Sequence, residues 1–200
     1  MTNMYSIKAT LAEAICVKED STILEELFNR YVTPQELLNA SAEELVSIKG
    51  ITARKAQQIV GTLKLARTIH APKAEGYRIS CPDDAFQLLR YEIGHLDHEE
   101  AWILCLNTKN RVISKNRISV GSLAAAIVHP REVFKQAILR SSASIIFAHN
   151  HPSGDCTPSQ EDISLSVRLK ECGELLGIDV LDSLVIGSVS YCSLKERGLM

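Results

Sequence analysis

The sequence lacks any segment that would cross a bilayer or direct secretion. No apolar run approaches the ~20 residues that span a membrane, and no basic stretch followed by an apolar core opens the chain. Its six cysteines form no C-x-x-C pair, and most of them lie in apolar runs. This usage argues against a disulfide framework and is typical of buried, reduced thiols. We therefore expect a cytoplasmic protein without a membrane partner.

Charge of one sign is also not in excess. The chain has 22 Lys and Arg against 24 Asp and Glu, which gives a formal net charge of -2. There is thus no global electrostatic attraction toward nucleic acid, and any contact with DNA must be local. Internal repeats and low-complexity tracts are absent, and 200 residues suffice for one domain or two small ones.

Residues 1–70 are expected to form a small all-helical domain. Apolar residues recur at helical spacing over 21–31, and a longer stretch over 53–69 has one continuous apolar face. Between them, Ser41 and Glu44 have the spacing of a capping box that would open a short helix. The sequence therefore predicts helices that end in a pair joined by a short turn.

This turn contains Gly50 and gives the pair the layout of a helix-hairpin-helix. Such motifs bind a DNA phosphate at the N-terminus of the second helix, where unpaired amides and the helix dipole favour an anion. Arg54 and Lys55 add charge at that point, so we expect residues 45–60 to contact DNA non-specifically through Gly50, Thr52, Arg54 and Lys55. The motif usually has a second glycine where this chain has Thr52. The alternative is two helices packed around a turn that binds nothing.

Residues 71–79 are polar, contain a proline and a glycine, and are predicted to be a linker. The domain that follows, 80–200, alternates strands with helices. Its first two strands are separated by a turn and should form an antiparallel hairpin. This mixture of elements predicts a layered α/β domain. The strands are expected at 101–106, 112–120, 143–148 and 178–186, and the helices begin near residues 82, 130 and 158.

His149 and His151 directly follow the apolar run 143–148. Side chains of a strand alternate, so both imidazoles point the same way, and α/β sheets place their sites at the carboxyl ends of strands. Asp162 lies on the apolar stripe of the next helix, so its carboxylate points inward and needs a partner. Two imidazoles and one carboxylate can hold a divalent metal and leave a position for water. The sequence thus predicts Zn²⁺ bound by His149, His151 and Asp162.

Simpler interpretations of these residues exist. A histidine on an apolar strand is more often a hydrogen-bonded core residue, and the spacing of Ser159 and Asp162 also fits a capping box. Other metal motifs do not fit the chain, because it has no H-E-x-x-H and neither the H-x-E nor the P-C-x-x-C of zinc deaminases.

The spacing of His149, His151, Ser159 and Asp162 resembles the motif of JAMM metalloproteases. The fuller string, His-Asn-His-Pro-Ser-Gly-Asp-x-Thr-Pro-Ser-x-x-Asp, resembles that of the RadC family, as does the segment 129–135. A helix-hairpin-helix followed by a JAMM domain is also the order in that family. The resemblance implies a three-layer α/β/α JAB domain, similar in shape to deaminases, behind a small all-α domain.

The resemblance also implies roles for single residues. JAMM enzymes use a glutamate at their first strand to activate the attacking water, and Glu100 is at the matching position, ahead of Glu99, which would lie on the opposite strand face. Ser159 would stabilise the oxyanion, and His129 would be structural or contact the substrate. We therefore predict a zinc-dependent hydrolase that cleaves a peptide or isopeptide bond in a peptide or protein substrate. The alternative is a DNA-binding protein associated with DNA repair, whose metal domain is structural or inactive.

Overall fold

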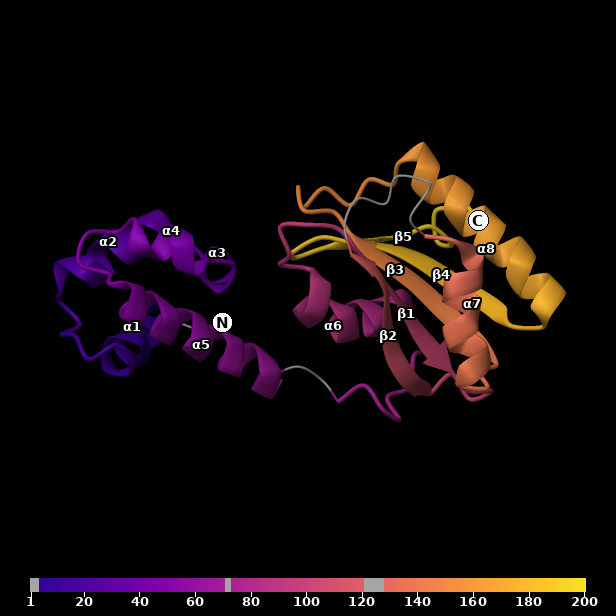
Figure 1. Cartoon of the computed structure of the whole chain (residues 1–200), viewed down its shortest axis with the longest axis horizontal. Coiled ribbons are helices and arrows are strands. Elements are labelled where there is room, and N and C mark those ends of the chain that lie inside the picture. The colour runs from indigo at the N-terminus through magenta and orange to yellow at the C-terminus, as the bar shows by residue number, and fades with distance from the viewer. Residues whose placement is uncertain (1–3, 71–72, 121–127) are drawn as a thin grey trace. The chain divides into compact units, whose positions relative to one another are not determined.

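The computed structural model describes residues 4–70, 73–120 and 128–200, and the chain divides into two compact units, 1–70 and 71–200 (Figure 1). The first unit is all-helical around one apolar core, to which Leu24, Leu27, Leu45 and Ile59 contribute fully buried side chains. Its helices are α1 (Met4–Ala14), α2 (Thr22–Arg30), α3 (Pro34–Leu38), α4 (Ala42–Val46) and α5 (Ala53–His70). No described helix is apolar over a length that would traverse a bilayer.

The second unit contains a five-stranded sheet with the strand order β2-β1-β3-β4-β5. The only parallel pair among its named strands is β3 with β4, and the connection between them is α8. The elements are α6 (Pro82–Ile93), β1 (Glu100–Leu106), β2 (Val112–Val120), α7 (Pro130–Leu139), β3 (Ser144–Asn150), α8 (Gln160–Leu176), β4 (Asp179–Ile186) and β5 (Tyr191–Ser193).

Helices cover both faces of this sheet. α6 packs on one face, and α7 and α8 pack on the other (Figure 1). β3 lies between β1 and β4 and is buried at each of its seven positions, as expected for a strand that has helices on both sides. The predicted α/β/α domain, which follows an all-α domain in the sequence, is therefore confirmed.

The chain reverses sharply at the carboxyl end of β3, which places the start of α8 beside that strand. Proline and glycine residues at 152 and 154 lie in the connecting loop, and Gly154 has a φ of +80° that favours glycine. α8 then runs back along the sheet and ends at Gly177, which is left-handed with φ +68°. As a result, the end of β3 and the first turn of α8 face one another.

The segment predicted to be a linker mostly belongs to the second unit. Residues 71 and 72 lie outside the described residues, but Gly76 donates to the carbonyl of Val112 and Ile79 donates to that of Asn110, both at 2.8 Å. Ile79 is also buried in the core under α6. The segment pairs with the β1–β2 hairpin because that hairpin leaves backbone groups free at its turn, a feature that local composition does not reveal.

Candidate metal centre

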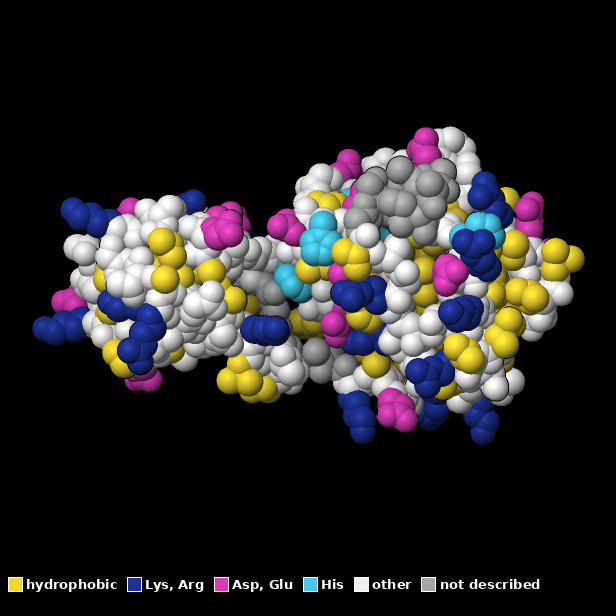
Figure 2. Space-filling view, in the orientation of Figure 1, with side chains coloured by type: hydrophobic (Ala, Val, Ile, Leu, Met, Phe, Trp, Pro, Cys, Tyr) yellow, Lys and Arg dark blue, Asp and Glu magenta, His cyan; other side chains and the backbone are white. Residues whose placement is uncertain are grey.

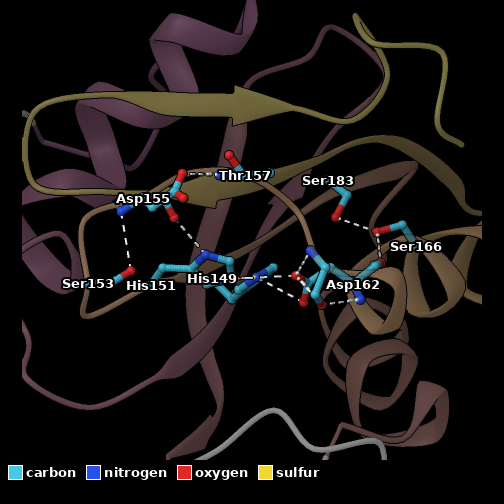
Figure 3. A network of polar contacts seen from close by, with 9 residues as sticks. His149, His151, Ser153, Asp155, Thr157, Asp162, Ser166 and Ser183 are labelled. Carbon is cyan, nitrogen blue, oxygen red and sulfur yellow. Dashed lines mark hydrogen bonds and ion pairs between the residues drawn. The ribbon is translucent and has the colours of Figure 1, made fainter.

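His149, His151 and Asp162 converge at the junction of β3 and α8 (Figure 3). His149 Nε2 lies 3.2 Å from His151 Nε2 and 3.1 Å from Asp162 Oδ1, and His151 Nε2 lies 3.5 Å from Asp162 Oδ2. Ligands of one tetrahedrally coordinated ion, with bonds near 2.05 Å, are separated by about 3.3 Å. The donor set and its spacing therefore fit a single divalent metal ion.

Each imidazole presents its Nε2 to the cluster. His149 is fully buried within β3, and its Nδ1 has no hydrogen-bond partner in the described part of the chain. His151 lies just beyond the strand, and its Nδ1 is 2.7 Å from the carbonyl oxygen of Asp155. Since a carbonyl only accepts, Nδ1 of His151 is the protonated nitrogen and Nε2 has a free lone pair for a metal.

Asp162 is held by the N-cap of its own helix. The backbone N–H and the hydroxyl of Ser159 both donate to Asp162 Oδ2 at 2.7 Å, and Asp162 N donates back to Ser159 Oγ at 3.1 Å. This capping box leaves Oδ1 directed at His149. Burial alone would raise the pKa of Asp162, but the two imidazoles beside it, when protonated, and the hydrogen bonds from Ser159 outweigh burial and hold that pKa well below its ordinary value. The carboxylate is therefore ionised and available as a ligand.

Glu100 does not face this cluster, which corrects the position expected from the sequence. The β1–β3 register places Ala101 opposite His149, so the preceding side chain projects to the other face of the sheet. There the Glu100 carboxylate accepts from the indole of Trp102 at 2.8 Å and from Arg117 at 3.1 Å. The prediction for Glu100 was wrong because the strand register differs by one residue from the one expected, and a shift of one residue exchanges the two faces of a strand.

Glu99 has the orientation that had been expected of Glu100. By the same alternation it lies on the face of Ala101 and His149. Its negative charge also contributes to the raised pKa of His151, after the larger effects of the hydrogen bonds of that imidazole with Asp162 and the Asp155 carbonyl. The half-buried Glu99 carboxylate is therefore close to the exposed side of the cluster.

A buried serine pair supports α8 behind the cluster. Ser166 Oγ bonds both the carbonyl oxygen of Asp162, at 2.8 Å, and Ser183 Oγ of β4, at 2.7 Å (Figure 3). Sequence reasoning missed both serines and the Asp155 carbonyl. The position of Ser166 four residues after Asp162 was the only local signal for the pair, since its partner lies on another strand.

Comparison with known proteins shows which family has this arrangement. A family model described as a RadC-like JAB domain matches residues 79–199, which is more than half of the chain. The chain belongs to the RadC-like JAB family. A UPF0758 protein of Geobacillus kaustophilus is 47% identical over 184 residues, covering 90% of this chain and 81% of the relative. A UPF0758 protein of Bacillus licheniformis is 50% identical over 165 residues, covering 82% and 74%.

His129 has a structural position within this RadC-like domain. It is the N-cap of α7, where its Nδ1 accepts from the backbone N–H of Arg131 at 3.2 Å. The cap satisfies one of the amides that a helix start leaves free. Of the two roles considered for His129, the structural one thus has a contact that accounts for it.

The N-terminal unit matches a second family model, described as a SAM-like helix-hairpin-helix tandem, over residues 21–65. Gly50 forms the turn between α4 and α5 with a φ of +90°, and a Cβ there would lie 2.9 Å from Ile23. Thr52 caps α5, since its hydroxyl accepts from the backbone N–H of Lys55 at 3.3 Å. The predicted hairpin is therefore present, and its cap uses one of the amides that a phosphate would need.

Proposed function

We propose that this RadC-family chain is a zinc-dependent hydrolase that cleaves a peptide or isopeptide bond. The observation that carries the proposal is the convergence of His149, His151 and Asp162 on one point, with Glu99 on the same face of the sheet. Two histidines and one carboxylate are a common catalytic zinc set, because three protein ligands leave a coordination position free. The structural alternative, a core histidine with satisfied hydrogen bonds, does not explain three ligand atoms at such spacing.

Zn²⁺ bound there would lower the pKa of a water to about 7 and polarise the scissile carbonyl. Glu99 would accept the proton of the attacking water on its carboxylate and deliver it to the leaving amine. Hydrogen bonds would keep His151 and Asp162 in position during these steps: His151 bonds the carbonyl of Asp155, and Asp162 accepts from the hydroxyl of Ser159. His151 is partly exposed and is followed by the exposed Pro152 and Ser153, so a substrate could enter from this side.

The role that we propose for Ser159 differs from the one predicted from the sequence, which was to donate a hydrogen bond to the oxyanion. Its hydroxyl proton is directed at Asp162 Oδ2, and its lone pairs accept from Asp162 N. We propose that Ser159 orients the carboxylate. A role at the oxyanion would require this proton to turn from Asp162 toward the substrate.

Metal removal tests the proposed hydrolase. The full chain loaded with Zn²⁺ should cleave members of a panel of peptides and isopeptide conjugates, followed by mass spectrometry. Treatment with a chelator should reduce cleavage to background, and added Zn²⁺ should restore it. A protein that contains stoichiometric zinc and cleaves no member of the panel would overturn the proposal.

Association with DNA is the second function that we propose, because the chain has a helix-hairpin-helix. The N-terminus of α5 presents backbone amides beside Arg54 and Lys55, and the dipole of an 18-residue helix favours an anion there. Figure 2 shows Lys and Arg side chains dispersed over the visible face of the unit rather than gathered into one patch. We therefore propose weak, phosphate-directed binding without sequence preference.

Replacing both Arg54 and Lys55 with Ala should weaken duplex binding by the full-length protein. Each phosphate contact contributes about 0.9 to the slope of log K against log salt, so the slope should fall by about 2. Fluorescence anisotropy between 20 and 200 mM salt, taken as roughly the range in which such contacts dominate, gives this slope. The exposed Lys64, about three turns further along α5, provides the control Lys64→Ala. Equal slopes for wild type and the double variant would eliminate the phosphate site.

A further inference from the structure

A cavity lined by polar side chains and by the apolar Val128 and Leu165 lies along the first turns of α8. Its volume is about 220 Å³, and Asp162 is one of its lining residues, together with Gln160, Glu161, Ser164 and Arg168. A water occupies about 30 Å³ of liquid, so the cavity has room for a side chain rather than a single solvent molecule. Because Asp162 contributes to both the cavity and the candidate metal cluster, a substrate bound at the cluster could place a neighbouring side chain in this cavity.

Arg168 is the one cation among these lining residues. Its side chain is exposed, and no residue in the described part of the chain forms a hydrogen bond or ion pair with its guanidinium. A guanidinium has five N–H donors in a planar fork that matches a carboxylate. An exposed, unpaired fork beside a catalytic cleft can therefore bind a substrate carboxylate without first breaking an internal contact.

Helix geometry gives the separation of this cation from Asp162 along the helix axis. Arg168 follows Asp162 by six residues, which corresponds to about 9 Å along α8. Long helical side chains lean toward the helix N-terminus, so the guanidinium lies nearer to Asp162 than its Cα does. An extended peptide advances about 3.3 Å per residue. Along the helix axis, the cation is thus separated from Asp162 by about the length of two residues of an extended peptide.

We propose that Arg168 selects substrates that carry a carboxylate about two residues from the cleaved bond, a specificity that rests on the proposed hydrolase function. Glu161 sharpens this preference, since its exposed carboxylate precedes Asp162 and would repel an acid adjacent to the bond. The cavity thus presents an acidic end near the metal and a basic end further along α8. A substrate that carries its acid about two residues from the cleaved bond keeps this acid away from Glu161 and brings it to Arg168.

Peptides that differ in the position of a single Glu test this preference. The Glu is moved from three residues before to three residues after the cleaved bond, and each peptide is paired with its Gln counterpart. The zinc-loaded full chain should show a kcat/KM about tenfold higher for Glu than for Gln at one position, about two residues from the bond. Arg168→Ala should lose this ratio, and Arg168→Glu should invert it in favour of Lys. Lys170→Ala, an exposed cation on the same helix that does not line the cavity, should keep it.

Two results separate this inference from the hydrolase proposal. Cleavage with equal Glu and Gln rates, or an unchanged preference in Arg168→Ala, would overturn the role of Arg168 and leave the hydrolase standing. If zinc-loaded protein cleaves nothing, equilibrium binding of the same peptides is the second measurement. Tighter binding of Glu peptides that is lost in Arg168→Ala supports the acid site without hydrolysis, and equal binding of all peptides overturns it.

Discussion

Replacing Glu99 with Gln should reduce peptide cleavage by about 10²–10⁴-fold while the protein still binds zinc, because a general base typically contributes that factor. The substitution keeps the size of the side chain and removes its ability to accept a proton. It leaves His149, His151 and Asp162 in place, so metal content should be unchanged. Steady-state kcat/KM and the zinc content of the same sample are the two measurements.

The neighbouring variant Glu100→Gln is the matched control. It makes the same chemical change one residue along β1, on the opposite face of the sheet, where Trp102 and Arg117 donate to the carboxylate. It should leave kcat/KM within a few-fold and destabilise the domain by about 1 kcal/mol, since the half-buried indole of Trp102 and the exposed Arg117 lose a charged acceptor. The reverse result, with Glu100→Gln inactive and Glu99→Gln active, would restore the assignment first made from the sequence.

The convergence of His149, His151 and Asp162 could be predicted because the signals for it are local. The two histidines are two residues apart, so the alternation of strand side chains places them on the same face, and the helix period directs Asp162 toward the sheet. Both periods depend only on neighbouring residues. The spacing of Ser159 and Asp162 also indicated a capping box, which is a local feature. The structure contains both this capping box and the cluster, so the two interpretations of Asp162 do not exclude each other.

The proposed base could not be predicted in the same way, because the face on which it lies depends on a distant strand. Glu99 directly precedes β1 and Glu100 is its first residue, and only the pairing of Ala101 with His149 decides which of the two faces the cluster. That register joins segments 48 residues apart and is set by packing of the whole sheet. The same limit applies to residues 76–79, whose pairing with the β1–β2 hairpin is invisible in their composition.

Replacing Asp162 with Ala should abolish tight zinc binding. The change removes the only carboxylate of the cluster and leaves two imidazoles, too few for a site with three protein ligands. In the wild type, affinity should also fall as pH is lowered through the pKa of His151, which lies above its ordinary 6.5, because a protonated imidazole cannot bind metal. Competition with a chromophoric chelator measures both effects. Retention of wild-type affinity by Asp162→Ala would show that the ion is held elsewhere.

Ser159→Ala distinguishes the two roles considered for this serine. If Ser159 orients Asp162, losing its hydroxyl should weaken zinc binding by about 10–100-fold, the usual effect of removing a residue that supports a ligand, and kcat should recover at saturating zinc. If its hydroxyl stabilises the oxyanion, kcat should instead fall by about 10²–10³-fold even when the site is full. The hydroxyl has one proton, and at 2.7 Å from Asp162 Oδ2 that proton is already donated, so we expect the first result.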